Sequence, residues 1–552
     1  MRNLTGADII CECLIEQGVD TVFGYPGGAV LNIYDSLYNY SDKIHHVLTA
    51  HEQGASHAAD GYARSTGRTG VVIATSGPGA TNLVTGIATA YMDSVPMVAI
   101  TGNVACSLLG LDSFQEVDIT GITMPITKHN FIVKNIDDLA DTIREAFRLA
   151  KSGRPGPVLV DIPKDVQTAT VEYTPQPAVK KDCPPCPSTE LLNEAVKLIN
   201  ESKRPILYCG GGVINADCSE SVTELAEKAD AYAAFSMMGL TAMDSKSPRY
   251  LGMSGMHGSY EATTALDKAD VIIAAGVRFT DRATGNKNRF AENSKIIHLD
   301  IDYAEQRKNI NSYLNICGDL EASLKYLTEH IKQKNNLQWH TEVEAMKEVS
   351  CTRPKTDKLL PETVLATVNK FAADDTPVAT DVGQHQMWTA QYYKFRKPRT
   401  FITSGGLGTM GFGLGGAIGA CMASGKQTVL ITSDGSFGMN LNELATAVSQ
   451  NLPLVIVIMN NKRLGMIRQW QTRFYGNRFM ATIPDRKTDF VKLAEAFGAY
   501  GMRAENEADL ESAVKKAFEL KSTVVIECLT DSNADVLPMI PPNGSADNIM
   551  LQ

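Results

Sequence analysis

The sequence predicts an α/β protein built from three doubly wound domains, each with a parallel sheet. Short apolar runs, such as residues 70–74, 97–100 and 157–161, alternate with stretches of helical pattern. Apolar strands that alternate with helices are typical of parallel sheets covered on both faces. The pattern recurs in each third of the 552 residues, and 44% apolar residues suffice for several buried cores.

Two segments are predicted to be linkers. Residues 173–187 contain five prolines, which neither a regular helix nor a central strand accommodates. In residues 333–361, polar and charged side chains replace the strand rhythm. We therefore expect domains at residues 1–172, 188–332 and 361–552, the last one including a C-terminal arm.

The composition narrows the class of function. A net charge of −10 without any run of Lys or Arg argues against a nucleic-acid surface and against a membrane-binding patch. No apolar stretch of about 18 residues and no secretion or transit signal is evident. Eleven cysteines, an odd number, are unlike a disulfide framework. We expect a cytoplasmic protein with reduced thiols.

The pair Cys183 and Cys186 encloses two prolines and has the spacing of a redox motif or of half a zinc site. A second ligand pair is missing, and the segment does not sit in a strand-to-helix turn. We interpret it as part of the first linker.

A possible metal and diphosphate site lies late in the chain. The apolar run 429–432 leads into a Ser-Asp-Gly-Ser turn at 433–436, and a second apolar run ends in Asn-Asn at 460–461. Oxygen atoms of Asp434 and Asn461 would suit a hard cation such as Mg²⁺, with a diphosphate against the ion and backbone N–H groups of the turn. An Asp-Gly-Ser turn alone is usually a surface turn, but the second strand end strengthens the prediction. Together with an isolated Glu52 far upstream, these residues suggest thiamine diphosphate.

From residue 3 to about residue 542 the chain resembles the catalytic large subunit of acetohydroxyacid synthase, also called acetolactate synthase. This family uses thiamine diphosphate in branched-chain amino-acid synthesis. The motifs that carry the resemblance are Phe-Gly-Tyr-Pro-Gly-Gly (23–28), Thr-Ser-Gly-Pro-Gly-Ala-Thr-Asn (75–82), Phe-Gln-Glu-Val-Asp (114–118), Arg-Pro-Gly-Pro-Val (154–158), Ser-Gly-Gly-Leu-Gly-Thr-Met-Gly (404–411) and Arg-Leu-Gly-Met-Ile-Arg-Gln-Trp (463–470).

The resemblance implies a function for the whole chain and for each domain. Pyruvate would be decarboxylated, and its two-carbon unit joined to a second pyruvate or to 2-ketobutyrate, the first common step of valine, leucine and isoleucine synthesis. The three domains would bind the pyrimidine of the cofactor, FAD, and the diphosphate with Mg²⁺, in that order.

Glu52 is the candidate activating carboxylate. Thiamine catalysis requires loss of the thiazolium C2 proton, and a carboxyl group that shares a proton with the pyrimidine ring promotes it. Local sequence leaves this role and a surface Glu at a helix start equally open, whereas the match over residues 51–54 favours catalysis. The resemblance implies that Glu52 acts on cofactor held by a partner subunit, with Phe114, Gln115 and Lys164 lining the same cavity. The active unit would be a homodimer or homotetramer with its sites at the subunit interface.

The resemblance assigns the remaining thiamine contacts to the last domain. Met410 would lie under the cofactor and enforce its bent shape, although a Met that fills a core gap is the alternative. Two departures stand out: Ser433 replaces a usual Gly, and Leu-Gly-Gly at 414–416 replaces Leu-Pro-Ala. The metal contacts would be Asp434, Asn461 and Arg463. The thiamine contacts would be Val382, Gly383, Gln384, His385, Gly408, Met410, Asp434, Gly435, Ser436, Asn461, Arg463 and Gly465.

The substrate pocket would be formed by four further residues. A planar guanidinium suits a carboxylate, so Arg282 would bind the acceptor acid unless it forms an ordinary surface ion pair. Trp470 would pack on the extra methyl of 2-ketobutyrate, which is worth about 1–3 kcal/mol. Met256 and Met466 would complete the apolar wall, although each Met taken singly suits a core. Catabolic acetolactate synthases lack the 463–470 motif and the flavin segments.

The central domain carries Gly turns and strand-end carboxylates that suit a dinucleotide, without a strict G-x-G-x-x-G. Because the joining reaction involves no net redox change, FAD would be structural. No regulatory domain is evident, so feedback would require a separate small subunit. The implied FAD contacts are Arg154, Gly210, Gly211, Gly212, His257, Gly258, Gly276, Val277, Arg278, Asp300, Ile301 and Asp319.

Two alternatives stay open. One is another thiamine enzyme of 2-keto acids, either a catabolic acetolactate synthase or an oxidase. The other is a catalytically dead paralogue, whose sign would be loss of Glu52, Asp434 or Asn461. All three residues are present.

Overall fold

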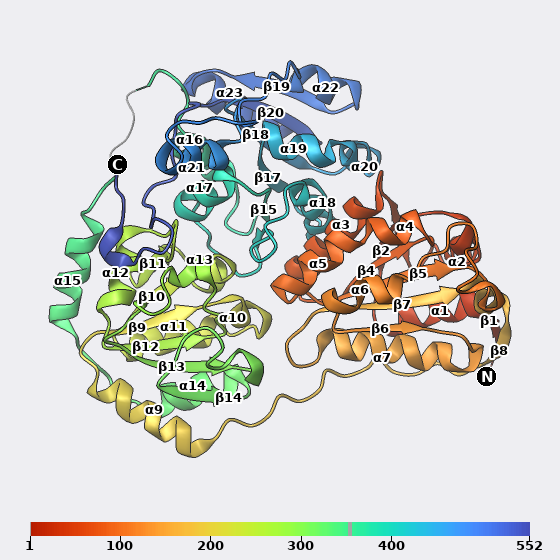
Figure 1. Ribbon diagram of the computed structural model, residues 1–552, viewed down its shortest axis with the longest axis horizontal. Helices are drawn as coiled ribbons and strands as arrows, with labels where there is room; N and C mark the ends of the chain where they lie inside the picture. The colour runs from red at the N-terminus through yellow and green to blue at the C-terminus, as the bar shows by residue number, and fades with distance from the viewer. Residues whose placement is uncertain (1, 352–355) are drawn as a thin grey trace.

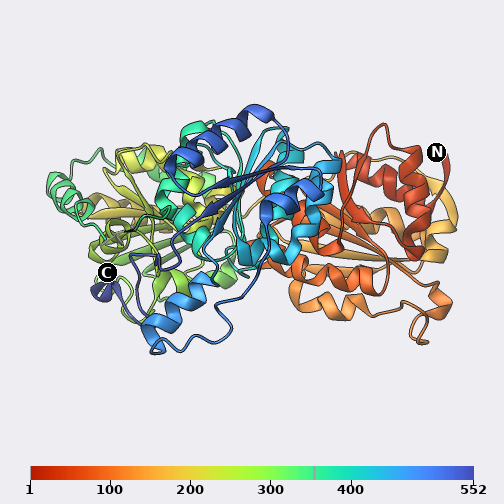
Figure 2. The ribbon, with the colours of Figure 1, turned by 90° about the horizontal axis from the view of Figure 1, so that it is seen from above.

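Three six-stranded sheets form the framework of the computed structural model, which describes residues 2–351 and 356–552. All strand pairs within these sheets are parallel, and helices pack on both faces of each sheet (Figure 1). The predicted fold class is therefore confirmed. In the view of Figure 2, the C-terminal sheet and its helices lie between the other two units.

The N-terminal sheet has the order β3-β2-β4-β5-β7-β6. A small antiparallel pair, β1 (Arg2–Thr5) and β8 (Thr170–Tyr173), closes this unit. Its other elements are β2 (Thr21–Tyr25), α1 (Gly6–Glu16), α2 (Leu31–Asn39), β3 (His45–Leu48), α3 (Glu52–Thr66), β4 (Gly70–Ala74), α4 (Pro78–Asn82), α5 (Val84–Asp93), β5 (Met97–Asn103), α6 (Ile119–Thr123), β6 (His129–Ile132), α7 (Leu139–Lys151), β7 (Pro157–Pro163) and α8 (Lys164–Thr168).

The central sheet has the order β11-β10-β9-β12-β13-β14, the arrangement of dinucleotide-binding sheets, in which the strand order reverses between the first and fourth strands. Its elements are α9 (Thr189–Glu201), β9 (Pro205–Cys209), α10 (Gly211–Asn215), α11 (Ser219–Lys228), β10 (Tyr232–Phe235), β11 (Tyr250–Met253), α12 (Tyr260–Lys268), β12 (Val271–Ala275), α13 (Asp281–Thr284), β13 (Lys295–Asp300), β14 (Leu314–Cys317) and α14 (Leu320–His330).

The C-terminal sheet, ordered β16-β15-β17-β18-β20-β19, repeats the connectivity of the N-terminal sheet. Its elements are α16 (Pro361–Phe371), β15 (Val378–Thr380), α17 (Gln384–Tyr392), β16 (Phe401–Ile402), α18 (Phe412–Ser424), β17 (Thr428–Ser433), α19 (Asp434–Asn440), α20 (Leu444–Ser449), β18 (Leu454–Asn460), α21 (Gly465–Phe474), α22 (Phe490–Ala496), β19 (Tyr500–Ala504), α23 (Glu507–Leu520) and β20 (Val524–Leu529).

The two predicted linkers have different outcomes. Residues 174–187 form neither helix nor strand, as expected, and Cys183 and Cys186 are exposed there. The second prediction is wrong in part, because residues 337–347 form the helix α15 (Leu337–Lys347). Its Trp339 is 1% exposed and donates its indole N–H to the Pro205 carbonyl at 3.2 Å. Buried positions spaced by four and three residues were the helical signal; residues 352–355 of this predicted linker lie outside the described part.

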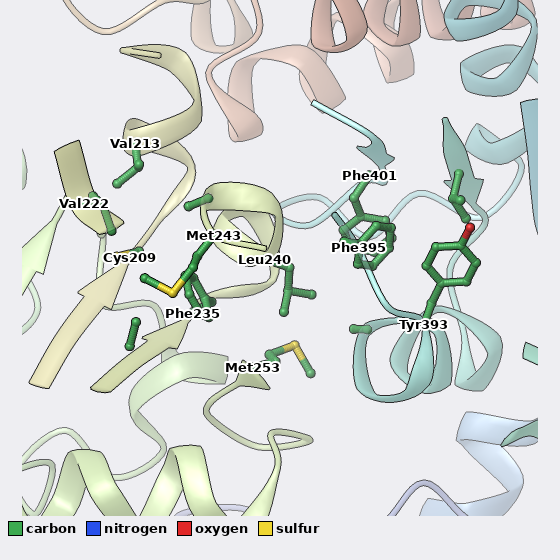
Figure 3. Close-up of a cluster of buried hydrophobic side chains, with 14 of the residues drawn as sticks. Cys209, Val213, Val222, Phe235, Leu240, Met243, Met253, Tyr393, Phe395 and Phe401 are labelled. Atoms are coloured by element: carbon green, nitrogen blue, oxygen red, sulfur yellow. The ribbon is translucent and has the colours of Figure 1, made fainter. Parts of the chain in front are cut away.

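The C-terminal domain shares buried surface with both neighbours. Figure 3 shows side chains of the central unit, among them Phe235 and Leu240, in one apolar cluster with Phe395 and Phe401 of the C-terminal unit. On the other side, α18 packs on α3 of the N-terminal unit. A β-carbon at Gly416 would meet the Phe412 ring at 2.9 Å, and one at Gly61 would lie 2.1 Å from the Gly416 carbonyl oxygen. The Gly-Gly departure at 415–416 thus occurs where two helix backbones approach closely.

None of the described helices combines the length and the apolar character needed to cross a membrane. The eleven cysteines are all among the described residues, and none of them forms a disulfide.

Candidate functional site

The predicted metal residues lie at the carboxyl ends of two adjacent strands. Asp434 is the first residue of α19, directly after β17, and Asn461 follows β18. Ser433 has extended backbone (φ −132°), and its hydroxyl accepts a hydrogen bond from the Ser436 N–H. The Ser-for-Gly departure therefore supplies a helix N-cap and strains no backbone.

Asp434 has the surroundings of a cation ligand. It is buried, and its Oδ1 has no hydrogen-bond partner among the described residues. Burial raises the pKa of its carboxyl to about 6. A buried carboxylate oxygen without a partner is costly, and Mg²⁺ bound by carboxylate and amide oxygens would remove that cost. Asn461, equally buried, accepts a hydrogen bond from the Arg463 N–H at 3.0 Å through its Oδ1.

Other residues of this domain that are expected to contact thiamine diphosphate lie at the same edge of the sheet. A β-carbon at Gly465 would lie 2.0 Å from Gln384 Oε1 and 2.9 Å from Asn461 Nδ2, so these three residues are in contact. Gln384 Oε1 and His385 Nε2 are buried without partners among the described residues. Burial lowers the pKa of His385 to about 3, so it is neutral. These unpartnered atoms fit a polar ligand at the strand ends.

Asp381, which the sequence analysis missed, organises the loops around this edge. Its buried Oδ1 accepts hydrogen bonds from the backbone N–H of Gly411 (2.8 Å) and Gly413 (3.0 Å), and its Oδ2 accepts one from the Thr432 hydroxyl (2.8 Å). The carboxylate thereby fixes the loop that carries the half-buried Met410. A polar residue directly before the predicted contacts 382–385, at the end of a buried strand, was the available signal.

Glu52 opens helix α3 and is buried, unlike the surface Glu that local sequence left open. Its Oε2 accepts a hydrogen bond from Asn82 Nδ2 at 3.0 Å. The approach to the helix is held from the C-terminal unit, because the carboxylate of Glu443 accepts hydrogen bonds from the backbone N–H of His51 (2.9 Å) and Ala50 (3.2 Å). The backbone before Glu52 is therefore fixed by contacts between the two units.

The three residues expected to accompany Glu52 are exposed on the N-terminal unit. The side chain of Phe114 is 87% exposed, Gln115 has a left-handed backbone (φ 57°), and Lys164 opens α8 at the surface. None of these three residues lines the large cavity of the chain, and neither does Glu52.

That cavity, of about 900 Å³, is lined by residues of all three units. It brings together ten of the twelve predicted flavin residues, namely Arg154, Gly211, Gly212, His257, Gly276, Val277, Arg278, Asp300, Ile301 and Asp319. It also reaches Met256, Arg282, Met466 and Trp470, together with Val382 and Gly408 of the thiamine loops. The volume suits a large organic ligand.

The glycines of the flavin segments allow close backbone approach. A β-carbon at Gly210 would lie 2.1 Å from the Gly276 carbonyl oxygen, and one at Gly276, with φ 59°, would lie 2.5 Å from the α-carbon of Gly212. Gly258, which does not line the cavity, packs on the Met253 carbonyl. His257 Nδ1 is buried without a partner among the described residues, and burial lowers the pKa of this side chain to about 4.

Three of the four predicted substrate residues contact one another in the lining of the cavity, through Arg282. The Arg282 guanidinium lies over the Trp470 ring, 5.9 Å from its centroid, and donates to Met256 Sδ at 3.2 Å. Its ion pair with Asp281 (3.7 Å) joins two largely exposed side chains, so it contributes little to stability. Arg282 is thus held beside apolar groups while its charge stays accessible to an anion.

Comparison with known families matches the three units in order. The model of the thiamine pyrophosphate enzyme N-terminal TPP binding domain matches residues 4–122, that of the central domain residues 192–327, and that of the C-terminal TPP binding domain residues 381–528. The chain belongs to the thiamine pyrophosphate enzyme family. Thiamine pyrophosphate is the thiamine diphosphate expected from the sequence.

Several acetolactate synthase subunits match this chain over its full length or nearly so. The chain is 42% identical to an acetolactate synthase large subunit of Buchnera aphidicola, with 100% of this chain and 99% of the relative covered. It is 42% identical to acetolactate synthase isozyme 3 large subunit of Escherichia coli, with the same coverage. Against an acetolactate synthase large subunit of Corynebacterium glutamicum it is 45% identical, with 99% and 90% covered. The resemblance found in the motifs therefore extends over the whole chain.

Proposed function

We propose that this thiamine pyrophosphate enzyme is the catalytic subunit of an anabolic acetolactate synthase. It would make 2-acetolactate from two pyruvate molecules and 2-aceto-2-hydroxybutyrate from pyruvate and 2-ketobutyrate. The observation that carries the proposal is the single cavity shared by Arg282, Trp470, the flavin segments and the thiamine loops. We infer that residues 1–172 bind the pyrimidine of the cofactor, residues 188–332 bind FAD, and residues 361–552 bind the diphosphate with Mg²⁺.

The chain's own residues hold the cofactors in this proposal. Asp434 and Asn461 would hold Mg²⁺ through their side-chain oxygens, with a backbone contact at Arg463, and the ion would compensate the charge of the diphosphate. Met410 would pack against the bound cofactor. Bound thiamine diphosphate supplies a carbon nucleophile and an electron sink for decarboxylation. Glu52 shares a proton with the pyrimidine nitrogen.

Four residues that line the cavity determine which acceptor reacts. Arg282 binds the carboxylate of the second 2-keto acid, because a guanidinium matches a carboxylate with two parallel hydrogen bonds. Trp470 packs on the side chain of the acceptor, with Met256 and Met466 completing an apolar wall. Apolar walls exclude water, which would otherwise divert the reaction.

We infer that the complete site contains two copies of the chain. Glu52, Phe114, Gln115 and Lys164 do not line the cavity of their own chain, and neither do Asp434 and Asn461. Phe114, Gln115 and Lys164 are exposed at the surface of the N-terminal unit, which agrees with their acting in a partner's site. A homodimer is the smallest assembly with this property, and a homotetramer contains it twice. Relatives named as large subunits support a separate small regulatory subunit, and a biosynthetic role of this kind supports a cytoplasmic location.

The flavin in this proposal is not reduced. The segments that include Arg154, Gly276, Arg278 and Asp300 would hold FAD, because the glycines would leave room for a pyrophosphate and the carboxylate would suit ribose hydroxyls. The joining of two keto acids transfers no net electrons, so FAD acts by binding alone.

A product assay tests the proposal. The purified chain, with thiamine diphosphate, Mg²⁺ and FAD, is given pyruvate alone and then pyruvate with an equal concentration of 2-ketobutyrate. We expect acetolactate in the first case and mainly 2-aceto-2-hydroxybutyrate in the second. Acetolactate as the dominant product of the mixture would favour the catabolic alternative, and acetate or acetaldehyde alone would contradict both.

A further inference from the structure

The carboxyl end of helix α5 is a joint between the three units. Its last residues, Met92 and Asp93, and the following Ser94 all line the large cavity. Two arginines of the predicted flavin site bind here: Arg278 donates to the Met92 carbonyl, and Arg154 donates to the Ser94 hydroxyl at 2.8 Å.

The side chain of Asp93 extends from this joint into the C-terminal unit. Its Oδ1 accepts a hydrogen bond from the Gly406 N–H at 2.7 Å, and its Oδ2 accepts one from the Gly405 N–H at 2.9 Å. These glycines begin the loop that continues through Gly408 to Met410. A carboxylate of the N-terminal unit therefore fixes the first turn of a loop expected to contact thiamine diphosphate.

Around Asp93, two buried carboxylates share one buried guanidinium. Its side chain is 0% exposed and forms an ion pair with Arg64 at 3.0 Å, and Arg64 is shared with a second buried carboxylate, Asp60. Two carboxylates thus divide one guanidinium. The next cation is Arg278, whose Nη2 lies 3.9 Å from Asp93 Oδ1. Removing a charge from water is costly unless the charge is well paired. Asp93 shares its main partner, Arg64, so it also attracts Arg278, which lines the cavity beside it.

We propose that Asp93 is a positioning residue that couples the flavin site to the thiamine site. The inference rests on the proposed function and gives the non-redox flavin a physical role. An anionic flavin bound at Arg154 and Arg278 orders these arginines at the α5 joint, and Asp93 transmits that order to the backbone of Gly405 and Gly406. By linkage, each cofactor then tightens the binding of the other by the same factor.

Binding measurements test the coupling without any assay of activity. Thiamine diphosphate is titrated into the full-length protein at saturating Mg²⁺, with and without saturating FAD, and followed by tryptophan fluorescence. For the wild type we expect FAD to tighten thiamine diphosphate binding by about tenfold, within the usual range of coupling between sites. The reverse titration, FAD with and without thiamine diphosphate, should give the same factor.

Asp93→Asn keeps the shape of the side chain but removes its charge and turns one acceptor into a donor. We expect the two thiamine diphosphate affinities of this variant to become equal, at the weaker value. Arg278→Gln removes the other end of the link and should give the same result at saturating FAD, which keeps the test valid if Asp93→Asn folds poorly. The matched control is Asp217→Asn, because Asp217 pairs with Arg399 between the central and C-terminal units but is largely exposed and lies outside the lining of the cavity. It should keep the wild-type coupling.

Three results would overturn the inference. One is a wild type whose thiamine diphosphate affinity does not depend on FAD. Another is an Asp93→Asn protein that keeps the full coupling factor. A wild type that binds neither cofactor would overturn the proposed function as well, and so differs clearly from the other two.

Discussion

Glu52 and Asp434 are buried carboxylates that begin helices in two different units, one after the edge strand β3 and the other after the central strand β17. Each is the first residue of a helix, α3 or α19, and lies near the carboxyl end of a parallel sheet, in units whose sheets share one strand connectivity. Glu52 already accepts a hydrogen bond from Asn82, whereas Asp434 Oδ1 has no partner within the described residues. Glu52 is thus a carboxylate that its own chain orients, whereas Asp434 keeps an oxygen without a partner among the described residues, and we propose that Mg²⁺ binds there.

The largest expected effect comes from Asp434→Ala. Removing a ligand of Mg²⁺ leaves the diphosphate charge uncompensated. Transition-state stabilisation should therefore weaken by several kcal/mol, and activity should fall about a hundredfold or more. Isothermal titration of thiamine diphosphate with and without Mg²⁺ measures the loss directly. Asp357→Ala, at an exposed site, serves as the control. Equal cofactor affinity in mutant and wild type, both in chelator and in Mg²⁺, would show that Asp434 is not a ligand.

Glu52→Gln tests the other carboxylate. The amide keeps the size of the side chain but cannot share a proton with the pyrimidine, so C2 hydrogen exchange of bound thiamine diphosphate should slow by about 10²–10⁴-fold, the usual contribution of a general acid or base. Cofactor affinity should change little. Exchange is followed by NMR after quenching, with the exposed Glu172→Gln as control. Exchange at the wild-type rate would remove Glu52 from the mechanism.

Mg²⁺ binding should depend on pH through Asp434. Because burial raises the pKa of Asp434 to about 6, its carboxyl takes up a proton as the pH falls through 6, and this proton competes with the cation. Mg²⁺ affinity should therefore fall by about tenfold for each pH unit below 6 and stay nearly constant above 7.

The apo protein should respond in the opposite sense. A carboxyl whose pKa is higher in the folded state than its ordinary 3.8 binds its proton more tightly when folded, so this group makes the apo protein more stable as the pH falls from about 6 towards 4. Thermal unfolding with and without Mg²⁺ at pH 5 and pH 7.5 records both effects. A Mg²⁺ affinity that does not change between these pH values would contradict the assignment.

The smallest expected change is that of Trp470→Leu, which alters acceptor choice and leaves the chemistry of both carboxylates intact. One lost methyl contact corresponds to a shift in product ratio of about tenfold, or roughly 1.4 kcal/mol. Competition between pyruvate and 2-ketobutyrate in one reaction, with both products quantified, gives the ratio. Phe474→Leu, one turn along the helix and with its ring centroid 5.4 Å from that of Trp470, removes a contact with the Trp470 ring and not one with the acceptor, so it should shift the product ratio less than Trp470→Leu. A lower total rate at an unchanged ratio would make Trp470 scaffold only.

The sequence could predict the parts of the site that depend on neighbouring residues. An apolar strand followed by Ser433 and Asp434 specifies a strand end and a capped helix start, because the cap needs a hydroxyl three residues before the N–H that it binds. The turn at Gly276 requires a positive φ that favours glycine. The sheets and the C-terminal thiamine loops were predictable for this reason.

Features that depend on distant residues were not predictable in the same way. Residues 337–347 were interpreted as linker, although they form a helix whose Trp339 packs against β9. The glycines at 415–416 are explained only by the close approach of α3, which leaves no room for larger side chains. The position of Asp93 between Arg64, Arg278, Gly405 and Gly406 has no local signal, since Arg64 lies 29 residues away and the two glycines more than 300 residues away along the chain.

The sequence by itself therefore determined which chemical groups stand at the ends of which strands, and with them the cofactor class. Periodic burial and the stereochemistry of turns are local, so they are encoded within a few residues. Only the tertiary structure decided which groups share a cavity: Arg282 and Trp470 meet the flavin segments, while Glu52, Phe114, Gln115 and Lys164 lie outside it. The packing of three domains fixes that grouping, because contacts between domains depend on long-range complementarity of surfaces and buried charges.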